Sequence, residues 1–359
     1  MKNNKLTFSL AILFILFAVG AGYIAPLIFL KWIAFLVILF LVLRAFLKGR
    51  KQEGNTAGKN LVVGIICIVL LGFISVPITD IAKAKHNSKI CPFQKAHMSD
   101  YYTQNDLKSP IDFKAYVKEL KEAASFLPMI SDSVKYENNY YEYFTINFLP
   151  EKPTKRIMII ASVHGDEPAG ALSIPVLLKE LTENGERYKN TAISILCPMN
   201  PVGLAFTSRE NGCGCNINRD YLTADQVETK HIINNIKAFK PNVIIDLHEN
   251  NGNWRTCLMA NTIVPDALGE KLCKKLTENN IELAENAFDA QLEMKGWHKR
   301  SAYRKMINKF AGLHDLMWYG QTLNVPVITL ECDQSLPSEK RISICNITIN
   351  TIVENINDL

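Results

Sequence analysis

The chain has 359 residues, which is enough for one sizeable globular domain with additional segments. Lysine and arginine number 40 against 35 aspartates and glutamates, so the net charge is only +5, and much of this excess lies beside apolar stretches near the amino terminus. Because the excess is small and lies mainly beside these stretches, we expect no nucleic-acid partner.

Three apolar runs dominate the first 80 residues. Residues 6–30 and 61–78 contain no charged side chain, and residues 32–43 continue the first run after Lys31. A bilayer core takes about 20 apolar residues per helix. Residues 1–80 therefore predict a membrane segment with about three transmembrane helices in contact with a lipid bilayer. The alternative is one long signal peptide followed by a single anchor.

Basic residues beside these runs indicate the orientation. Lys2 and Lys5 precede the first run, and five basic residues fill the loop 44–59, so both segments are expected on the cytoplasmic side. We therefore expect a multi-pass integral membrane protein whose remaining chain lies outside the cytoplasm. Lysines at 83, 85 and 89 argue for the opposite orientation.

The rest of the chain divides into a neck and one domain. Residues 81–139 form the expected neck or linker, in which apolar side chains at helical spacing predict an amphipathic helix over 112–126. From residue 140 to 359, apolar strands alternate with helices, which favours an α/β sheet covered on both faces. The expected strands are 140–148, 156–164, 191–199, 242–248, 256–261 and 325–332, and the expected helices are 168–183, 224–239, 266–287 and 338–356.

The stretch 157–170 contains two metal-ligand residue types at a turn. It is typical of a buried strand that ends at His164 and Gly165 and leads into a helix. Glu167 falls in the first helical turn, where a carboxylate is favoured, and Pro168 suits the same turn. Imidazole and carboxylate are normal zinc ligands, and catalytic zinc sites need three protein ligands. The alternative is that the pair merely ends a strand and caps a helix.

His248 is the candidate for the third ligand, because it ends another apolar strand, 243–249. The carboxyl ends of such strands are where α/β sheets bind their ligands. Asp246 shares a strand face with His248 and could orient it, whereas Glu249 points to the other face. Glu331 ends the apolar strand 325–332 and is placed as a general base; a capping or ion-paired acid is the alternative.

The loop 200–221 supplies cationic and amide groups. Arg209 and Arg219 could hold a substrate carboxylate or an oxyanion, and Asn218 adds an amide donor. Taken singly, an arginine is more often a surface charge, but the place of both in this loop favours a functional role. Nine cysteines, most of them isolated in apolar runs, leave the redox state open, and Cys213-Gly-Cys215 is too sparse a pattern for a zinc knuckle.

These motifs together resemble a known family. The order resembles that of zinc metallocarboxypeptidases of the carboxypeptidase A type, and the related aspartoacylase and succinylglutamate desuccinylase branch shares it. The resemblance covers roughly residue 140 to the carboxyl terminus and implies a mixed-sheet, three-layer α/β/α domain. Its motifs are His164-Gly-Asp-Glu167, Asn200-Pro-Val-Gly203, Arg209, Asn218-Arg219, His248 and Glu331.

The resemblance also implies a role for each residue. One zinc ion would be held by His164, Glu167 and His248. Glu331 would be the general base, and Arg209 would polarise the scissile carbonyl.

The same resemblance places a substrate-binding group beside the metal. Asn218 and Arg219 would hold the terminal carboxylate, and a tyrosine upstream of the base, Tyr303 or Tyr319, would contact the substrate. The chain departs from the family at Asn216, where many members have an acidic residue, which weakens the support of one zinc ligand. Only 28 residues (359 − 331) follow the glutamate, which favours the carboxypeptidase-like branch.

The sequence therefore predicts a membrane-anchored zinc hydrolase acting on an amide next to a free carboxylate. The expected substrate is a peptide, which makes the chain a metallocarboxypeptidase. An N-acyl amino-acid deacylase of the related branch is the first alternative. A non-catalytic binding module with a decayed zinc site is the second.

Overall fold

The computed structural model describes residues 111–250, 254–287, 290–292, 294–300 and 314–359. Within these ranges no helix is both long enough and apolar enough to cross a bilayer. The spans predicted in residues 1–80, the neck up to residue 110 and Tyr303 all lie outside the described residues.

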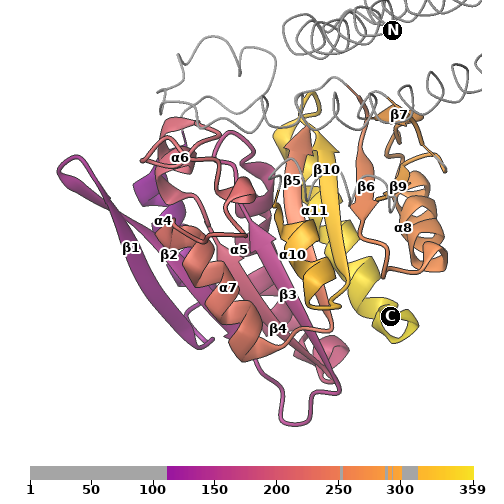
Figure 1. Cartoon of the computed structure of the whole chain (residues 1–359). Coiled ribbons are helices and arrows are strands. Elements are labelled where there is room, and N and C mark those ends of the chain that lie inside the picture. Colours follow the sequence, from indigo (N-terminus) through magenta and orange to yellow (C-terminus); the bar gives the residue numbers. More distant parts are fainter. Residues whose placement is uncertain (1–110, 251–253, 288–289, 293, 301–313) are drawn as a thin grey trace, which may run out of the picture. The chain divides into compact units, whose positions relative to one another are not determined.

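A mixed eight-stranded sheet forms the centre of the described part of the chain (Figure 1). In spatial order the strands are β1 (Met129–Tyr136), β2 (Asn139–Phe148), β4 (Thr191–Cys197), β3 (Lys155–Ala161), β5 (Val243–Asn250), β10 (Val327–Asp333), β6 (Cys257–Ala260) and β9 (Trp297–Lys299). Strands β4, β3, β5 and β10 run parallel to one another. Strand β2 pairs antiparallel with both β1 and β4, β6 pairs antiparallel with β10, and β9 pairs parallel with β6.

Helices cover both faces of this sheet. In β3, Ile157 and Ile159 pack into a core with one set of helices, while Met158 and Ile160 pack into a second core on the opposite face. The first core is covered by α4 (Phe113–Ala123), α5 (Ala169–Glu183), α8 (Asp266–Glu278) and α11 (Ser338–Glu354). The second is covered by α7 (Val227–Phe239) and α10 (Leu316–Thr322), which lie in front of the sheet in Figure 1. The predicted three-layer α/β/α arrangement with a mixed sheet is confirmed.

The compact unit starts before residue 140, where the sequence analysis placed its boundary. Helix α4 contributes Tyr116 and Leu120 to the first core, and β1 pairs along its whole length with β2. Strand β1 lies at the sheet edge, and most of its side chains are exposed. It therefore lacks the apolar pattern by which the other strands were predicted.

Two predicted elements differ in extent. The helix expected over 266–287 ends at Glu278, because Asn279 closes the last turn and Asn280 adopts a positive φ of 59°. Short strands β7 (Asn286–Ala287) and β8 (Ala290–Gln291) follow it. The loop expected over 200–221 contains α6 (Pro201–Phe206) and a 3-10 turn, Ile217–Arg219.

The topology brings three strand ends to one edge. Ala161 of β3 lies opposite Leu247 of β5, and His248 of β5 lies opposite Glu331 of β10. Because all three strands are parallel, the chain segments that follow them meet at the same edge. His164 comes three residues after β3, so His164, His248 and Glu331 converge there as predicted.

Candidate metal centre

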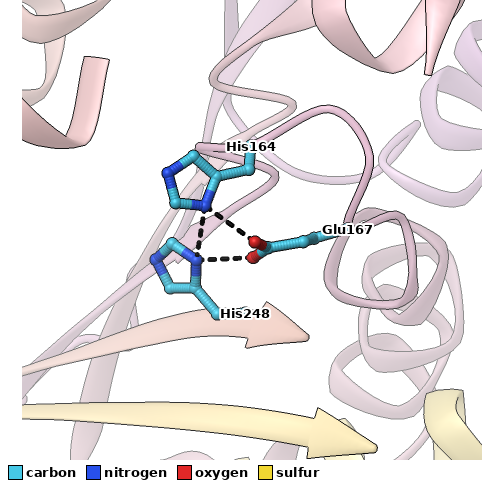
Figure 2. Close-up of side chains that lie close together, drawn as sticks. All are labelled: His164, Glu167 and His248. Atoms are coloured by element: carbon cyan, nitrogen blue, oxygen red, sulfur yellow. Dashed lines mark hydrogen bonds and ion pairs between the residues drawn. The ribbon is translucent and has the colours of Figure 1, made fainter. Parts of the chain in front are cut away.

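Two histidines and a glutamate form a buried cluster at this edge (Figure 2). His164 Nδ1 lies 2.9 Å from Glu167 Oε1, and His248 Nδ1 lies 2.6 Å from Glu167 Oε2. The two Nδ1 atoms are 3.1 Å apart. Each of the three residues is at most 5% exposed. The predicted ligand set is thus assembled, with one donor atom of each residue turned toward a common point.

The turn that carries His164 and Glu167 depends on a glycine. A Cβ atom on Gly165 would lie only 1.9 Å from the carbonyl carbon of Gly203, so no other residue fits without moving the backbone. Gly165 N also donates to Ser208 O at 2.9 Å. The His-Gly-Asp-Glu turn and the loop before Arg209 are therefore packed backbone against backbone.

The outer nitrogen of each histidine meets an oxygen. His248 Nε2 lies 3.0 Å from Asp246 Oδ2, as the shared strand face predicted, and His164 Nε2 lies 3.2 Å from Asn216 Oδ1. A hydrogen bond at Nε2 fixes the orientation of the ring and leaves Nδ1 to bind a metal ion. Asn216 thus takes the orienting position, but as a neutral amide it polarises its imidazole less than a carboxylate would.

The electrostatics of the cluster suit a cation. Burial lowers the pKa of His164 to about 3, and the charge of Arg209 acts in the same direction. Burial opposes ionisation of Glu167, but the charges of His164 and His248 hold its pKa well below the ordinary value. Burial opposes protonation of His248, but the charges of Asp246 and Glu167 raise its pKa well above the ordinary value, so this imidazole holds a proton that a bound metal ion would displace. An ionised carboxylate between two imidazoles is a donor set that fits zinc.

Glu331 lies beside the cluster on the same sheet face as His248. Burial raises the pKa of Glu331 to about 7; the charges of His248 and Arg209 oppose this rise, and the charge of Glu167 adds to it. A carboxyl group with a pKa near neutrality can both accept and return a proton. This placement agrees with the predicted general base.

Arg209 is held next to the ligands by the Asn200 motif. Asn200 Oδ1 accepts from Gly203 N at 2.8 Å and so caps α6, while Asn200 Nδ2 donates to Arg209 O at 3.2 Å. Arg209 Nη1 lies 2.7 Å from Glu167 Oε1, and its side chain remains 41% exposed. The guanidinium therefore lies between the ligand cluster and solvent, where a substrate could reach it.

Asn218 and Arg219 lie in the 3-10 turn that follows Asn216. Asn218 Oδ1 accepts from Leu316 N at 3.1 Å, so this amide ties two loops together. Arg219 Nη1 donates to Asn218 O at 2.7 Å. Burial lowers the pKa of Arg219; the charge of Asp315 opposes that shift, and the charge of Arg209 adds to it.

Tyr319 is the one tyrosine candidate within the described residues. It lies on α10, its ring is 5.8 Å from that of Tyr221, and both belong to the core on the α7 and α10 face. These contacts support a packing role for Tyr319 and give no support to the predicted substrate contact. Tyr303, the other candidate, falls outside the described residues.

Two features of the site were not predicted as such. Arg300 forms a two-point ion pair with Asp315 beside the Arg219 loop, and neither residue follows an apolar strand that would have drawn attention to it. Glu249, expected to be uninvolved, does point to the opposite face, but its Oε2 accepts from Ala169 N at 2.7 Å and its Oε1 pairs with the buried Arg341. It thereby anchors the start of the helix that follows Glu167.

Comparison with known proteins points to one group of hydrolases. Residues 153–294 match the family model described as the succinylglutamate desuccinylase/aspartoacylase catalytic domain. Carboxypeptidase 2 of Trichophyton rubrum is 31% identical over 104 residues, which is 28% of this chain and 19% of that protein. Carboxypeptidase 2 of Trichophyton tonsurans is 30% identical over 106 residues. The matched region spans about a fifth of the length of these relatives.

Solved structures share the fold. A candidate metallopeptidase from Shewanella denitrificans OS217 superimposes with a TM-score of 0.54 at 16% identity, covering 76% of this chain and 99% of that one. A metallo-carboxypeptidase from Pseudomonas aeruginosa, in complex with (2-guanidinoethylmercapto)succinic acid, gives a TM-score of 0.51 at 15% identity, covering 68% and 69%. The resemblance predicted from the motifs is confirmed: part of the chain matches the desuccinylase/aspartoacylase family model and carboxypeptidase sequences, and the fold is that of solved metallopeptidases.

Proposed function

We propose that this chain is a zinc-dependent metallocarboxypeptidase, which hydrolyses an amide bond next to a free carboxylate. One observation carries the proposal: the buried His164, Glu167 and His248 cluster lies directly beside Glu331 at a single sheet edge. A zinc ion bound by these three residues would supply a Lewis acid that polarises a carbonyl and acidifies water.

The residues of the chain divide the remaining work. Glu331 takes a proton from the attacking water and returns it to the leaving amine. Arg209 lies 2.7 Å from a ligand carboxylate and half in solvent, so it can donate to the oxygen on which negative charge develops. Arg219 offers a guanidinium fork to the free carboxylate of the substrate.

A deacylase of the succinylglutamate desuccinylase and aspartoacylase type is the second candidate. The observation that favours it is the family model, which matches residues 153–294 and therefore includes all three proposed ligands. Both reactions cleave an amide beside a carboxylate, and the same groups would serve either. They differ in whether the acyl part is a peptide or a small acid.

We also propose that the hydrolase is attached to a membrane with its active site outside the cytoplasm. The support is the sequence alone: three apolar runs within residues 6–78 and the basic loop between the second and third. The test is to fuse, after Thr79, a reporter enzyme that works only in the cytoplasm. Activity of this reporter would contradict the proposed orientation.

A substrate comparison on the full chain in detergent tests the catalytic proposal. Short peptides with free and amidated carboxyl termini would be assayed beside N-acetyl and N-succinyl amino acids, with and without a chelator. The metallocarboxypeptidase predicts cleavage of free-carboxylate peptides that the chelator abolishes and added Zn²⁺ restores. Faster hydrolysis of the acyl amino acids would favour the deacylase. A purified chain that binds no zinc would instead favour the non-catalytic module.

A further inference from the structure

A two-point ion pair lies at the arginine-rich side of the site. Arg300 Nη1 is 2.8 Å from Asp315 Oδ1, and Arg300 Nη2 is 2.6 Å from Asp315 Oδ2. The two side chains are only 16% and 13% exposed. Both carboxylate oxygens of Asp315 are thus engaged by one guanidinium fork, the strongest arrangement for such a pair.

Asp315 lies next to the loop that carries Arg219. Leu316 N donates to Asn218 Oδ1 at 3.1 Å, and Tyr221 N donates to His314 O at 3.2 Å. The two neighbours of Asp315 therefore bond to Asn218, which precedes Arg219, and to Tyr221, which lies two residues after it. Asp315 Oδ1 also accepts from Trp318 N and caps α10. The carboxylate is therefore fixed in the neighbourhood of Arg219, and its negative charge acts on that guanidinium.

Most N–H groups of the Arg219 guanidinium form no hydrogen bond with the described residues. Within the described part of the chain its hydrogen bond is to Asn218 O, which uses one of the five N–H groups of a guanidinium. The largely buried carboxylate of Asp315 in the adjacent loop would be the natural competitor for the others. The arrangement raises the question of what prevents that competition.

We propose that Arg300 is a positioning residue that occupies Asp315 and thereby leaves Arg219 available to the carboxylate of the substrate. This rests on the proposed function, in which Arg219 binds that carboxylate. Without Arg300, Asp315 turns to Arg219, the free charge on this side of the site disappears, and carboxylate binding weakens. The reacting groups at Glu331 and the metal ligands are left in place.

The test compares Arg300→Gln with Arg300→Gln/Asp315→Asn in the full chain. The probe is 3-phenylpropanoate, a simple carboxylate, whose binding is measured by calorimetry without turnover. Arg300→Gln should weaken binding roughly tenfold or more, the scale of a charge-assisted hydrogen bond, and adding Asp315→Asn should restore most of it. In the peptide assay the same variants should change KM far more than kcat.

Restoration by a second substitution separates this role from a merely structural one. If the ion pair only held the loops together, removing its second member would not recover binding, and that result would overturn the inference. Unchanged binding in Arg300→Gln, or a wild-type chain that binds no 3-phenylpropanoate, would overturn it as well. If the wild type binds the probe but hydrolyses no peptide, the proposed function fails while the binding comparison still decides the role of Arg300.

The matched control is Arg187→Gln. Arg187 also pairs with two carboxylates, Glu180 at 2.6 Å and Glu354 at 2.5 Å, but it lies on the 3-10 turn before β4, at the end of the sheet opposite the site. Its loss removes a comparable ion pair from the fold. Binding of 3-phenylpropanoate should not change in this variant.

Discussion

The two sides of the site are built differently. The metal side takes His248 and Glu331 from neighbouring parallel strands and His164 from the turn after a third, so the sheet itself sets their spacing. The arginine side takes Arg219, Arg300 and Asp315 from loops and turns. The Arg219 and Asp315 loops are tied by the hydrogen bond from Leu316 N to Asn218 Oδ1, whereas Arg300 follows the short edge strand β9 and its N donates to Ala260 O at 2.9 Å.

The residues on the metal side are held more rigidly than those on the arginine side. Residues at the ends of a buried sheet are fixed by many backbone bonds, which suits a metal with strict demands on distance and geometry. Loop residues held by a few polar contacts can be exchanged without disturbing the sheet. The metal side should therefore set the chemistry, and the arginine side should set which substrate is bound.

The largest effect should come from the reactive group on the metal side. Glu331→Gln should lower kcat by about 10²–10⁴, because the amide cannot accept a proton, while the zinc content stays that of the wild type. Turnover assays and metal analysis of the same sample check this. Glu339→Gln, an exposed acid in the first turn of α11, is the control. Activity retained in Glu331→Gln would show that Glu331 is not the general base.

The next effect tests the arginine side. Arg219→Gln should raise KM for a peptide with a free carboxyl terminus roughly tenfold to a hundredfold, because a charge-assisted pair is lost. Neither kcat nor zinc content should change comparably. The amidated peptide should bind equally poorly to variant and wild type. A loss of zinc in Arg219→Gln would mean that the two sides are not separable.

Two substitutions test the residues that orient the histidines on the metal side. Asp246→Asn should weaken zinc binding by about 10- to 100-fold, since the group that orients His248 loses its charge. Asn216→Asp should strengthen zinc binding, because it gives His164 the carboxylate that it lacks. Competition with a chromogenic chelator measures both affinities. Equal affinities in all three proteins would show that these outer contacts do not tune the site.

The smallest effect concerns the stability of the loop 200–221, which carries Arg209 and Arg219. Asn211 Nδ2 donates to Glu228 at 3.2 Å, and burial raises the pKa of Glu228 above its ordinary value of 4.5. The folded chain then holds this proton more tightly than the unfolded chain, so the stability from Glu228 is complete below pH 4.5 and is lost as the pH rises through the folded pKa. Glu228→Gln should flatten this fall in the free energy of unfolding, measured by urea unfolding at several pH values. A parallel pH profile in the variant would contradict it.

The same contrast explains what the sequence could and could not predict. His164, His248 and Glu331 are predicted because each lies at the end of an apolar strand, and strand ends of a parallel sheet meet. Glu167 is predicted because it falls in the first helical turn, three residues after His164. The α/β class and most helices followed from the same periodicity. Strand β1 was missed because an exposed edge strand carries no apolar alternation.

Side-chain ties between loops leave no such pattern. Nothing in the sequence near Arg300 or Asp315 indicates that they pair, since they are fifteen residues apart and the strand before Arg300, β9, is only three residues long and has no apolar run. Asp246 was predicted because its partner lies two residues away on one strand. The contact of Asn216 with His164 depends on the path of a whole loop, and only the structure places it.

The contact between Gly165 and Gly203 links the two motifs that bear them. Because no side chain fits at Gly165, and Gly203 belongs to the cap that holds Arg209, neither glycine can change alone. Among descendants of one ancestral chain, the two positions should therefore be inherited as a unit. Substitutions at one should be accompanied by compensating changes at the other, whereas the positions of Arg300 and Asp315 are free to diversify as a separate pair.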